Sequence, residues 1–153
     1  MILDERNEFA DATALSTGAA GTYLIGDQID TTLANNIGAI DGLHLVIQVT
    51  TGITAAAAGT VSFSLASDAQ AAIATDGSAT VHFTTRAFAT SATAIAAGTV
   101  LATVALPRGF TYERYLGILQ TTGTAAITAG AINAFLTTEP GNWVAYDSPK
   151  HLT

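Results

Sequence analysis

The stretch TVSFSLAS, residues 60–67, alternates apolar side chains with small polar ones. Successive side chains of an extended strand point to opposite faces, so Val61, Phe63 and Leu65 share one face and the serines between them share the other. One apolar and one polar face are typical of an antiparallel sheet that covers a core on one side only. This stretch therefore predicts a half-buried β-strand.

The same period of two recurs along most of the chain. It is found in four further stretches, residues 42–50, 80–86, 99–107 and 130–138, and residues 22–26 are a shorter strand candidate. Residues 114–122 are apolar on both faces, which predicts a strand that is covered on both sides. The apolar positions of these strands form the expected core: Leu45, Ile47, Val61, Phe63, Leu65, Val81, Phe83, Val100, Val104, Ile132 and Leu136.

Seven or eight short strands and few helical periods predict an all-β domain. The expected architecture is a jelly-roll-like β-sandwich of two antiparallel sheets, with extended N- and C-terminal arms. We place an N-terminal arm at residues 1–14, the sandwich at residues 15–138 and a C-terminal tail at residues 139–153. The tail is too short to bury its own aromatic side chains, Trp143 and Tyr146, so we expect it to fold back or to lie on a partner.

The composition excludes several classes of protein. The 153 residues are 49% hydrophobic and only 11% charged, compared with about 25% charged residues in typical domains. The formal net charge is −7, and no cluster of Lys and Arg is present to neutralise phosphates, so we expect no nucleic-acid partner. Runs of about 18 apolar residues, a signal peptide and Cys are absent from the sequence, and we expect no membrane span and folding in a reducing cytoplasm.

The residues that could bind a metal or catalyse a reaction do not converge in the sequence. His44 and His82 lie on predicted strands, on the faces opposite the apolar rows. Asp27, Asp30 and Asp41 do not have the spacing of a calcium loop, so we assign them to turns. The motifs of a nucleophile elbow and of a phosphate-binding loop are also missing. We therefore expect no catalytic residues, no metal, no cofactor and no enzymatic activity.

Charged and aromatic side chains are concentrated in LPRGFTYERYLGILQTTG, residues 106–123. Pro107 ends one strand because it has no N–H to donate, and Gly109 permits a turn. Two interpretations remain open for this stretch: a loop closed by surface ion pairs, or an anchor for an interface, where Arg and Tyr are enriched. The residues expected to contact another protein molecule are Arg108, Tyr112, Glu113, Arg114, Trp143 and Tyr146.

Four stretches of the chain carry a resemblance to a known family. They are MILDERNEFADATALS at residues 1–16, VSFSLASD at 61–68, LPRGFTYERYLGI at 106–118 and TAGAINAFLTTEP at 128–140. Together they resemble the cement, or decoration, proteins of tailed-phage capsids, and most closely the podovirus type with a jelly-roll fold. The likeness extends to about residue 140, and the block at residues 106–118 is its most specific part.

The resemblance implies a structural virion protein that forms a homo-oligomer, a dimer or a trimer, on the outer surface of a bacteriophage capsid. Its partner there would be the major capsid protein, whose lattice it would stabilise after assembly in the cytoplasm of the host bacterium. The residues proposed above as contacts would then touch the capsid or a second copy of the chain. A carbohydrate- or receptor-binding β-sandwich of a phage particle is the alternative, and it would need exposed aromatic side chains from Trp143, Tyr146 and Tyr112.

Overall fold

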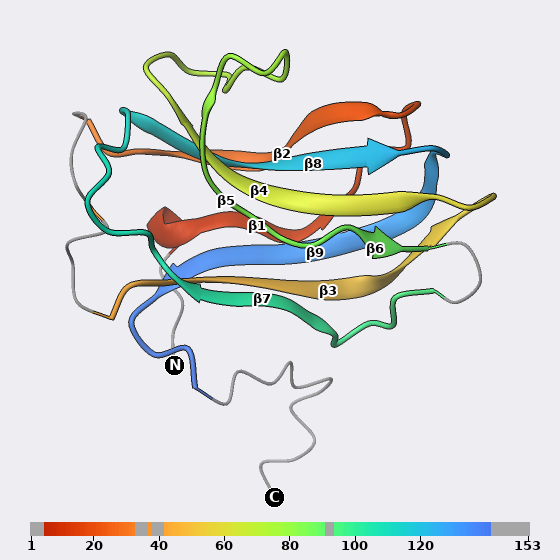
Figure 1. Ribbon diagram of the computed structural model, residues 1–153. Helices are drawn as coiled ribbons and strands as arrows, with labels where there is room; N and C mark the ends of the chain where they lie inside the picture. The colour runs from red at the N-terminus through yellow and green to blue at the C-terminus, as the bar shows by residue number, and fades with distance from the viewer. Residues whose placement is uncertain (1–4, 33–36, 38–41, 91–93, 142–153) are drawn as a thin grey trace, which may run out of the picture.

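The alternating stretches of the sequence form two antiparallel sheets that pack face to face (Figure 1). The computed structural model describes residues 5–32, 37, 42–90 and 94–141. Within these residues, sheet A has the strand order β1-β9-β3-β7, and sheet B has the order β2-β8-β4-β5, with β6 also pairing with β4. The elements are the 3₁₀ turn η1 (Glu5–Asn7), β1 (Glu8–Ala14), β2 (Gly21–Asp30), β3 (His44–Ala55), β4 (Thr60–Asp68), β5 (Thr80–Thr84), β6 (Phe88–Ala89), β7 (Val100–Ala105), β8 (Tyr115–Gly123) and β9 (Ile127–Thr137).

The strand order is that of a jelly roll. The chain crosses between the two sheets at almost every connection: β1, β3, β7 and β9 lie in sheet A, whereas β2, β4 and β8 lie in sheet B. Each sheet can be followed from top to bottom in Figure 1 in its strand order, with β1 and β7 at the two edges of sheet A and β2 and β5 at those of sheet B. The expected all-β sandwich of two antiparallel sheets is therefore confirmed.

The inner faces of the two sheets bury one hydrophobic core. Phe63 and Leu65 of sheet B and Leu45, Ile47 and Ile132 of sheet A are all at most 1% exposed. Complete burial of one such side chain stabilises a fold by about 1.5–3 kcal/mol relative to exposure. The core positions that the alternation predicted correctly as buried are Leu45, Ile47, Val61, Phe63, Leu65, Ile132 and Leu136, and two more, Phe83 and Val104, are half-buried.

Two residues that we expected in the core, Val81 and Val100, are exposed by 52% and 42%. The exposure of each side chain results from an extra residue in its edge strand. Consecutive residues of β4 pair with Phe83 and Val81, so His82 is inserted between them, and consecutive residues of β3 pair with Ala102 and Val100, so Leu101 is inserted. A β-bulge of this kind rotates the strand and exchanges the faces of the side chains beyond it.

The segment that we assigned to an N-terminal arm contributes a strand to the sandwich. Glu8–Ala14 is strand β1, which pairs with β9 at the edge of sheet A, and Phe9 is 1% exposed in the core. Strand β1 approaches β2 closely at Gly26, whose φ is +70° and where a Cβ would overlap the carbonyl oxygen of Phe9. At the other end, the tail is described only as far as Gly141.

The outer face of sheet B is covered by the connection between β4 and β5, residues 69–79. Ile73 of this connection is 2% exposed and packs with Leu119 and Ala66 of the sheet. Asp68 orders the connection, because its two carboxylate oxygens accept hydrogen bonds from the backbone N–H groups of Gln70 and Ala74, both at 3.1 Å. No helix of the described residues is long and apolar enough to cross a membrane.

Candidate contact surface

The loop between β7 and β8, residues 106–114, is held to the sandwich by Tyr112. This side chain is fully buried, and its hydroxyl donates a hydrogen bond to the carbonyl oxygen of Pro107, 2.8 Å away. Its ring stacks on the imidazole of His82, with the ring centres 4.0 Å apart. Burial raises the pKa of the Tyr112 hydroxyl, which keeps it protonated as a donor. Tyr112, which we expected to contact another molecule, is thus buried within its own chain, where it supports the loop from beneath.

A hydrogen-bonded cluster of three side chains fixes the same loop from the other side. The hydroxyl of Ser67, which is completely buried, donates to Oε2 of Glu113 at 3.3 Å and accepts from the backbone N–H of Glu113 at 3.2 Å. Nε2 of His82 lies 2.8 Å from the same hydroxyl. The Ser67 hydroxyl has a single proton, so His82 donates from Nε2 whenever that proton is directed to Glu113.

This cluster contains the three residue types of a serine hydrolase, but in a different order. In such enzymes the His lies between the Ser and the acid, so that it can take the hydroxyl proton. Here Ser67 lies between His82 and Glu113, and its buried hydroxyl is engaged on both sides. The arrangement clamps the loop onto strand β4. His82 reaches the cluster because the bulge in β5 turns its ring toward the loop, whereas the alternation had placed it on the solvent side.

Arg114 connects the loop to strand β2. Its guanidinium donates two hydrogen bonds to the carboxylate of Asp30, from Nε at 2.8 Å and from Nη2 at 2.7 Å, and it lies over the ring of Tyr115. Both members of the pair are partly exposed. The hydrogen bond from Arg114, with a second one from the backbone N–H of Thr32, lowers the pKa of Asp30 to about 2. Glu113 and Arg114 thus bind partners in their own chain.

The loop presents two side chains to solvent at its tip. Arg108 is exposed, and Phe110 is 56% exposed beyond Gly109, whose φ of +81° allows the turn. The ring of Phe110 meets His82 edge-on at 6.4 Å, next to the exposed Val81. We did not predict Phe110 and Val81 as contact residues; the only signal for Phe110 was an aromatic residue directly after a Pro-Arg-Gly turn.

Of the six residues that we expected at a contact surface, the structure leaves Arg108 at the surface and places three in the support of the loop. The other two, Trp143 and Tyr146, lie outside the described residues. The residues that the sequence did not connect to the loop are Ser67, His82 and Asp30, which are distant from it along the chain. Long-range pairing of this kind leaves no local pattern in the sequence.

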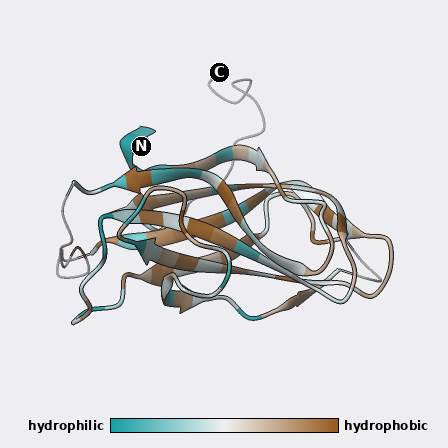
Figure 2. Ribbon diagram, turned by 90° about the horizontal axis from the view of Figure 1, so that it is seen from above, coloured by the Kyte–Doolittle hydropathy of each residue, from teal (hydrophilic) through white to brown (hydrophobic). Residues whose placement is uncertain are grey.

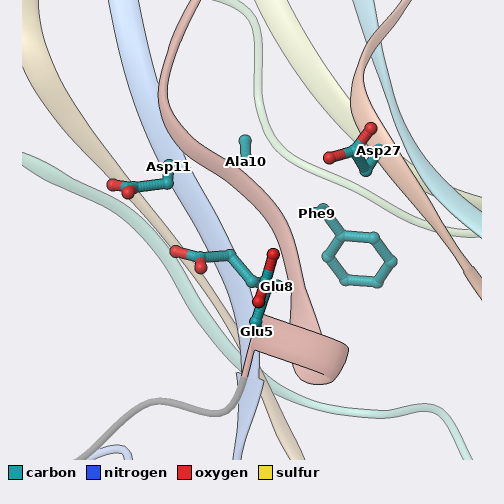
Figure 3. Close-up of a pocket in the computed structure, with 6 residues that line it drawn as sticks. All are labelled: Glu5, Glu8, Phe9, Ala10, Asp11 and Asp27. Carbon is teal, nitrogen blue, oxygen red and sulfur yellow. The ribbon is translucent and has the colours of Figure 1, made fainter.

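A second candidate site is an acidic hollow between the edges of β1 and β2 (Figure 3). It has a volume of about 340 Å³ and is lined by Glu5, Glu8, Phe9, Ala10, Asp11 and Asp27. Partial burial and the carboxylates of Asp11 and Glu5 raise the pKa of Glu8. The carboxylates of Glu8 and Asp11 lie on the opposite side of β1 from the ring of Phe9. Within the described ranges, no three His, Asp or Glu residues are placed to hold a metal ion.

The histidines and aspartates considered as metal ligands lie apart. His44 is in sheet A, where its Nδ1 lies 2.6 Å from the carbonyl oxygen of Gly42, and His82 is in sheet B. Asp30 is engaged by Arg114 and accepts a hydrogen bond from the N–H of Thr32 at 2.7 Å, as expected of a turn aspartate. Asp41 lies outside the described residues.

A model of a known protein family matches most of the chain. The family model described as Bbp16 matches residues 9–136, from the second residue of β1 to the next-to-last residue of β9. The match therefore includes both sheets, the β7–β8 loop and the Ser67–His82–Glu113 cluster. No curated protein matches the chain.

Proposed function

Because the chain belongs to the phage-associated Bbp16 family, we propose that it is a structural protein of a phage particle, which binds the outer surface of the capsid as a cement or decoration protein. The observation that carries this proposal is the family match over nearly all of the described sandwich. Its partner is the major capsid protein, and its work is to stabilise the lattice of capsid subunits. We propose further that it acts as a dimer or a trimer and is assembled in the cytoplasm of the host bacterium.

The architecture is suited to such a role. A decoration protein stabilises a lattice only if it binds the assembled form and keeps its own shape while it does so, because ordering a flexible surface on binding costs free energy. The β7–β8 loop is already ordered by Tyr112, by the Ser67 cluster and by Arg114, so Arg108 and Phe110 are presented on a fixed support. Aromatic and Arg side chains are the residues that most often supply interface energy.

The proposed mechanism is mass action without a chemical step. A ligand that binds only the closed lattice stabilises it by RT ln(1 + [L]/Kd) at each site, and the effect is repeated over every site of the particle. Each molecule therefore needs only moderate affinity. The sequence supplies many small Ala, Gly, Ser and Thr side chains, which lose little conformational entropy when they are ordered at an interface.

Electron microscopy of the phage particle tests the proposal directly. We expect density for this sandwich on the outer surface of the head, in a copy number close to that of the major capsid protein. A few dozen copies at one vertex or on a fibre would instead favour the carbohydrate- or receptor-binding module. That alternative needs exposed aromatic side chains for binding, and one of the three expected ones, Tyr112, is buried in the sandwich. Absence from the purified particle would contradict both.

A further inference from the structure

Large hydrophobic side chains remain exposed on two edge strands and on the loop that follows one of them. Among the described residues they are Val81 of β5, Val100 of β7 and Phe110 of the loop that follows β7. Strands β5 and β7 each form one edge of their sheets, and β1 and β2 form the opposite edges, where they contact each other. Exposed apolar side chains gathered on one face mark an interaction surface more often than scattered ones do.

Acidic side chains are unevenly distributed between the same two edges. Residues 77–112, which include β5, β6, β7 and the loop tip, contain no Asp or Glu and two basic residues, Arg86 and Arg108. The acidic residues of the opposite edge are Glu5, Glu8, Asp11, Asp27 and Asp30. Figure 2 shows the strongly hydrophilic ribbon of η1 and the start of β1, near the label N. In a chain of net charge −7, strands β5, β6 and β7 and the loop tip thus carry no acidic side chain, and we call them the acid-free edge; Glu113, the next acidic residue, is engaged by Ser67.

The backbone of the acid-free edge is open as well. In the described residues, β5 pairs only with β4, and β7 pairs only with β3. Natural edge strands are protected against further pairing by charged side chains, as β1 is by Glu8 and Asp11 and β2 by Asp27 and Asp30. Strands β5 and β7 carry no charged residue. Arg86 stands between β5 and β6, exposed, with its guanidinium 4.5 Å from the ring centre of Phe88.

We propose that the acid-free edge is the face that docks on the capsid, and that the surface it meets there is an acidic protein surface. The inference rests on the proposed function and adds the orientation of the molecule and the chemistry of its partner. Charge complementarity selects an acidic partner for Arg86, and Val81 of β5 and Phe110 of the loop supply apolar contacts. The acidic edge of β1 and β2 then points away from the capsid, where like charges would otherwise repel the acidic surface.

A binding assay with phage heads that lack this protein tests the orientation. We expect Arg86→Glu to lower the affinity for heads at least tenfold, and the wild-type affinity to fall as salt is raised, because exposed charge pairs are screened. Arg6→Glu is the matched control: it is the same substitution at an exposed position, but on η1 at the acidic edge. We expect it to change the affinity by less than twofold. Val81→Ser, which removes an exposed side chain without altering charge, is expected to weaken binding as well.

The outcomes separate the inference from the proposed function. If the wild-type protein does not bind heads at all, the proposed function is wrong. If it binds and the two Arg→Glu variants lose affinity equally, or neither loses any, the docking face is wrong while the function stands. If Arg86→Glu or Val81→Ser changes the oligomeric state of the free protein in sedimentation and leaves head binding intact, the edge joins two copies of the chain and the inference is overturned. Thermal melting of each variant verifies that it is folded.

Discussion

Tyr112 holds the β7–β8 loop through both its ring and its hydroxyl. The ring stacks on His82, and the hydroxyl closes the loop onto the carbonyl oxygen of Pro107. A buried Tyr usually finds a hydrogen-bond partner, since an unpaired hydroxyl in a core costs free energy. From the sequence, a Tyr between Thr111 and Glu113 in a polar loop was as compatible with a surface contact as with an anchor. Only the fold decides between the two.

We expect Tyr112→Phe to destabilise the protein by about 0.5–1.5 kcal/mol, the usual contribution of one hydrogen bond, because the ring contacts remain. Urea unfolding measures the change. Tyr23→Phe is the matched control: the Tyr23 hydroxyl also donates to a carbonyl oxygen, that of Ala19, at 2.7 Å, but in an exposed setting. The control is expected to cost less. Equal losses in the two variants would contradict the anchoring role of Tyr112.

The protonation of His82 makes the stability of the fold depend on pH. Burial lowers the pKa of His82 below its ordinary value of 6.5, and the nearby Glu113 carboxylate opposes this only in part. Below pH 6.5 the unfolded chain therefore binds more protons than the folded protein, and acid favours unfolding. The contribution of His82 to the unfolding free energy is complete above pH 6.5. It is lost as the pH falls through the pKa of His82 in the folded protein.

The unfolding free energy, measured from about pH 8 to about pH 5, is therefore expected to decrease on the acid side in the wild type. The decrease is expected to be smaller in His82→Gln, whatever the absolute stability of that variant. Asp30 titrates in a separate window: its pKa is lowered from 3.8 to about 2, so its stabilising effect is present above pH 3.8 and disappears toward pH 2. If the unfolding free energy of His82→Gln decreases with falling pH as steeply as that of the wild type, His82 is not the source of the decrease.

The strands show how far the sequence determines this fold. Alternation predicted β4 and its core residues Phe63 and Leu65 correctly, because a regular pleat places every second side chain on the same face. It placed Val81 and Val100 wrongly, because each lies next to a bulge that shifts the pattern by one residue. A bulge is set by the pairing with the neighbouring strand, which local sequence does not contain.

The pairings that build the candidate site are also non-local. Asp30 and Arg114 are 84 positions apart, and Ser67 and Glu113 are 46 apart. The sequence indicated that residues 106–114 were unusual, since they gather charged and aromatic side chains, but it could not tell which of them face inward. Strand β1 was missed for a related reason: its alternation is interrupted by two register shifts and by Ala12 in a left-handed conformation with φ of +45°.

Strand β2 approaches the backbone of β1 closely at Gly26. We expect Gly26→Ala to destabilise the fold by several kcal/mol, because the new Cβ would add a clash with the backbone of Phe9 to the strain of a left-handed φ. Gly98→Ala is the control. It has a similar φ of +84°, but no atom lies within 4 Å of the added Cβ, so only the conformational cost of about 1 kcal/mol is expected. Thermal unfolding of both variants measures the difference, and equal losses would show that the approach of the two strands has no effect.

At the scale of the molecule, the two sides of the described sandwich differ in their acidic side chains. Residues 69–79 cover the outer face of sheet B. The edge strands β1 and β2 carry acidic side chains, whereas the edge strands β5 and β7 carry none. We expect a protein with this distribution to bind an acidic surface through the edge formed by β5 and β7. The asymmetry is a property of the complete fold, since it depends on which strands become neighbours at the edges.

The capsid proposal predicts a measurable gain in the stability of phage heads. Heads without this protein are expected to melt at a higher temperature when it is added, and the shift should increase with its concentration. At a free concentration of 100 times Kd, each site gains about 2.7 kcal/mol. The Arg86→Glu variant needs a higher concentration for the same shift, and the melting curve of heads with added Arg6→Glu follows that of the wild type. Heads that melt at the same temperature with and without the protein would contradict a stabilising role.

The pairing of β1 with β9 has a consequence for biosynthesis. Glu8 faces Phe135, so β1 pairs with a strand that lies far from it along the chain. Until β9 has emerged from the ribosome, β1 lacks this partner and sheet A is incomplete. We expect pairing over such a distance to form slowly, as in other all-β topologies with distant contacts. We also expect the acidic side chains of β1 to disfavour its pairing with other chains before β9 is in place.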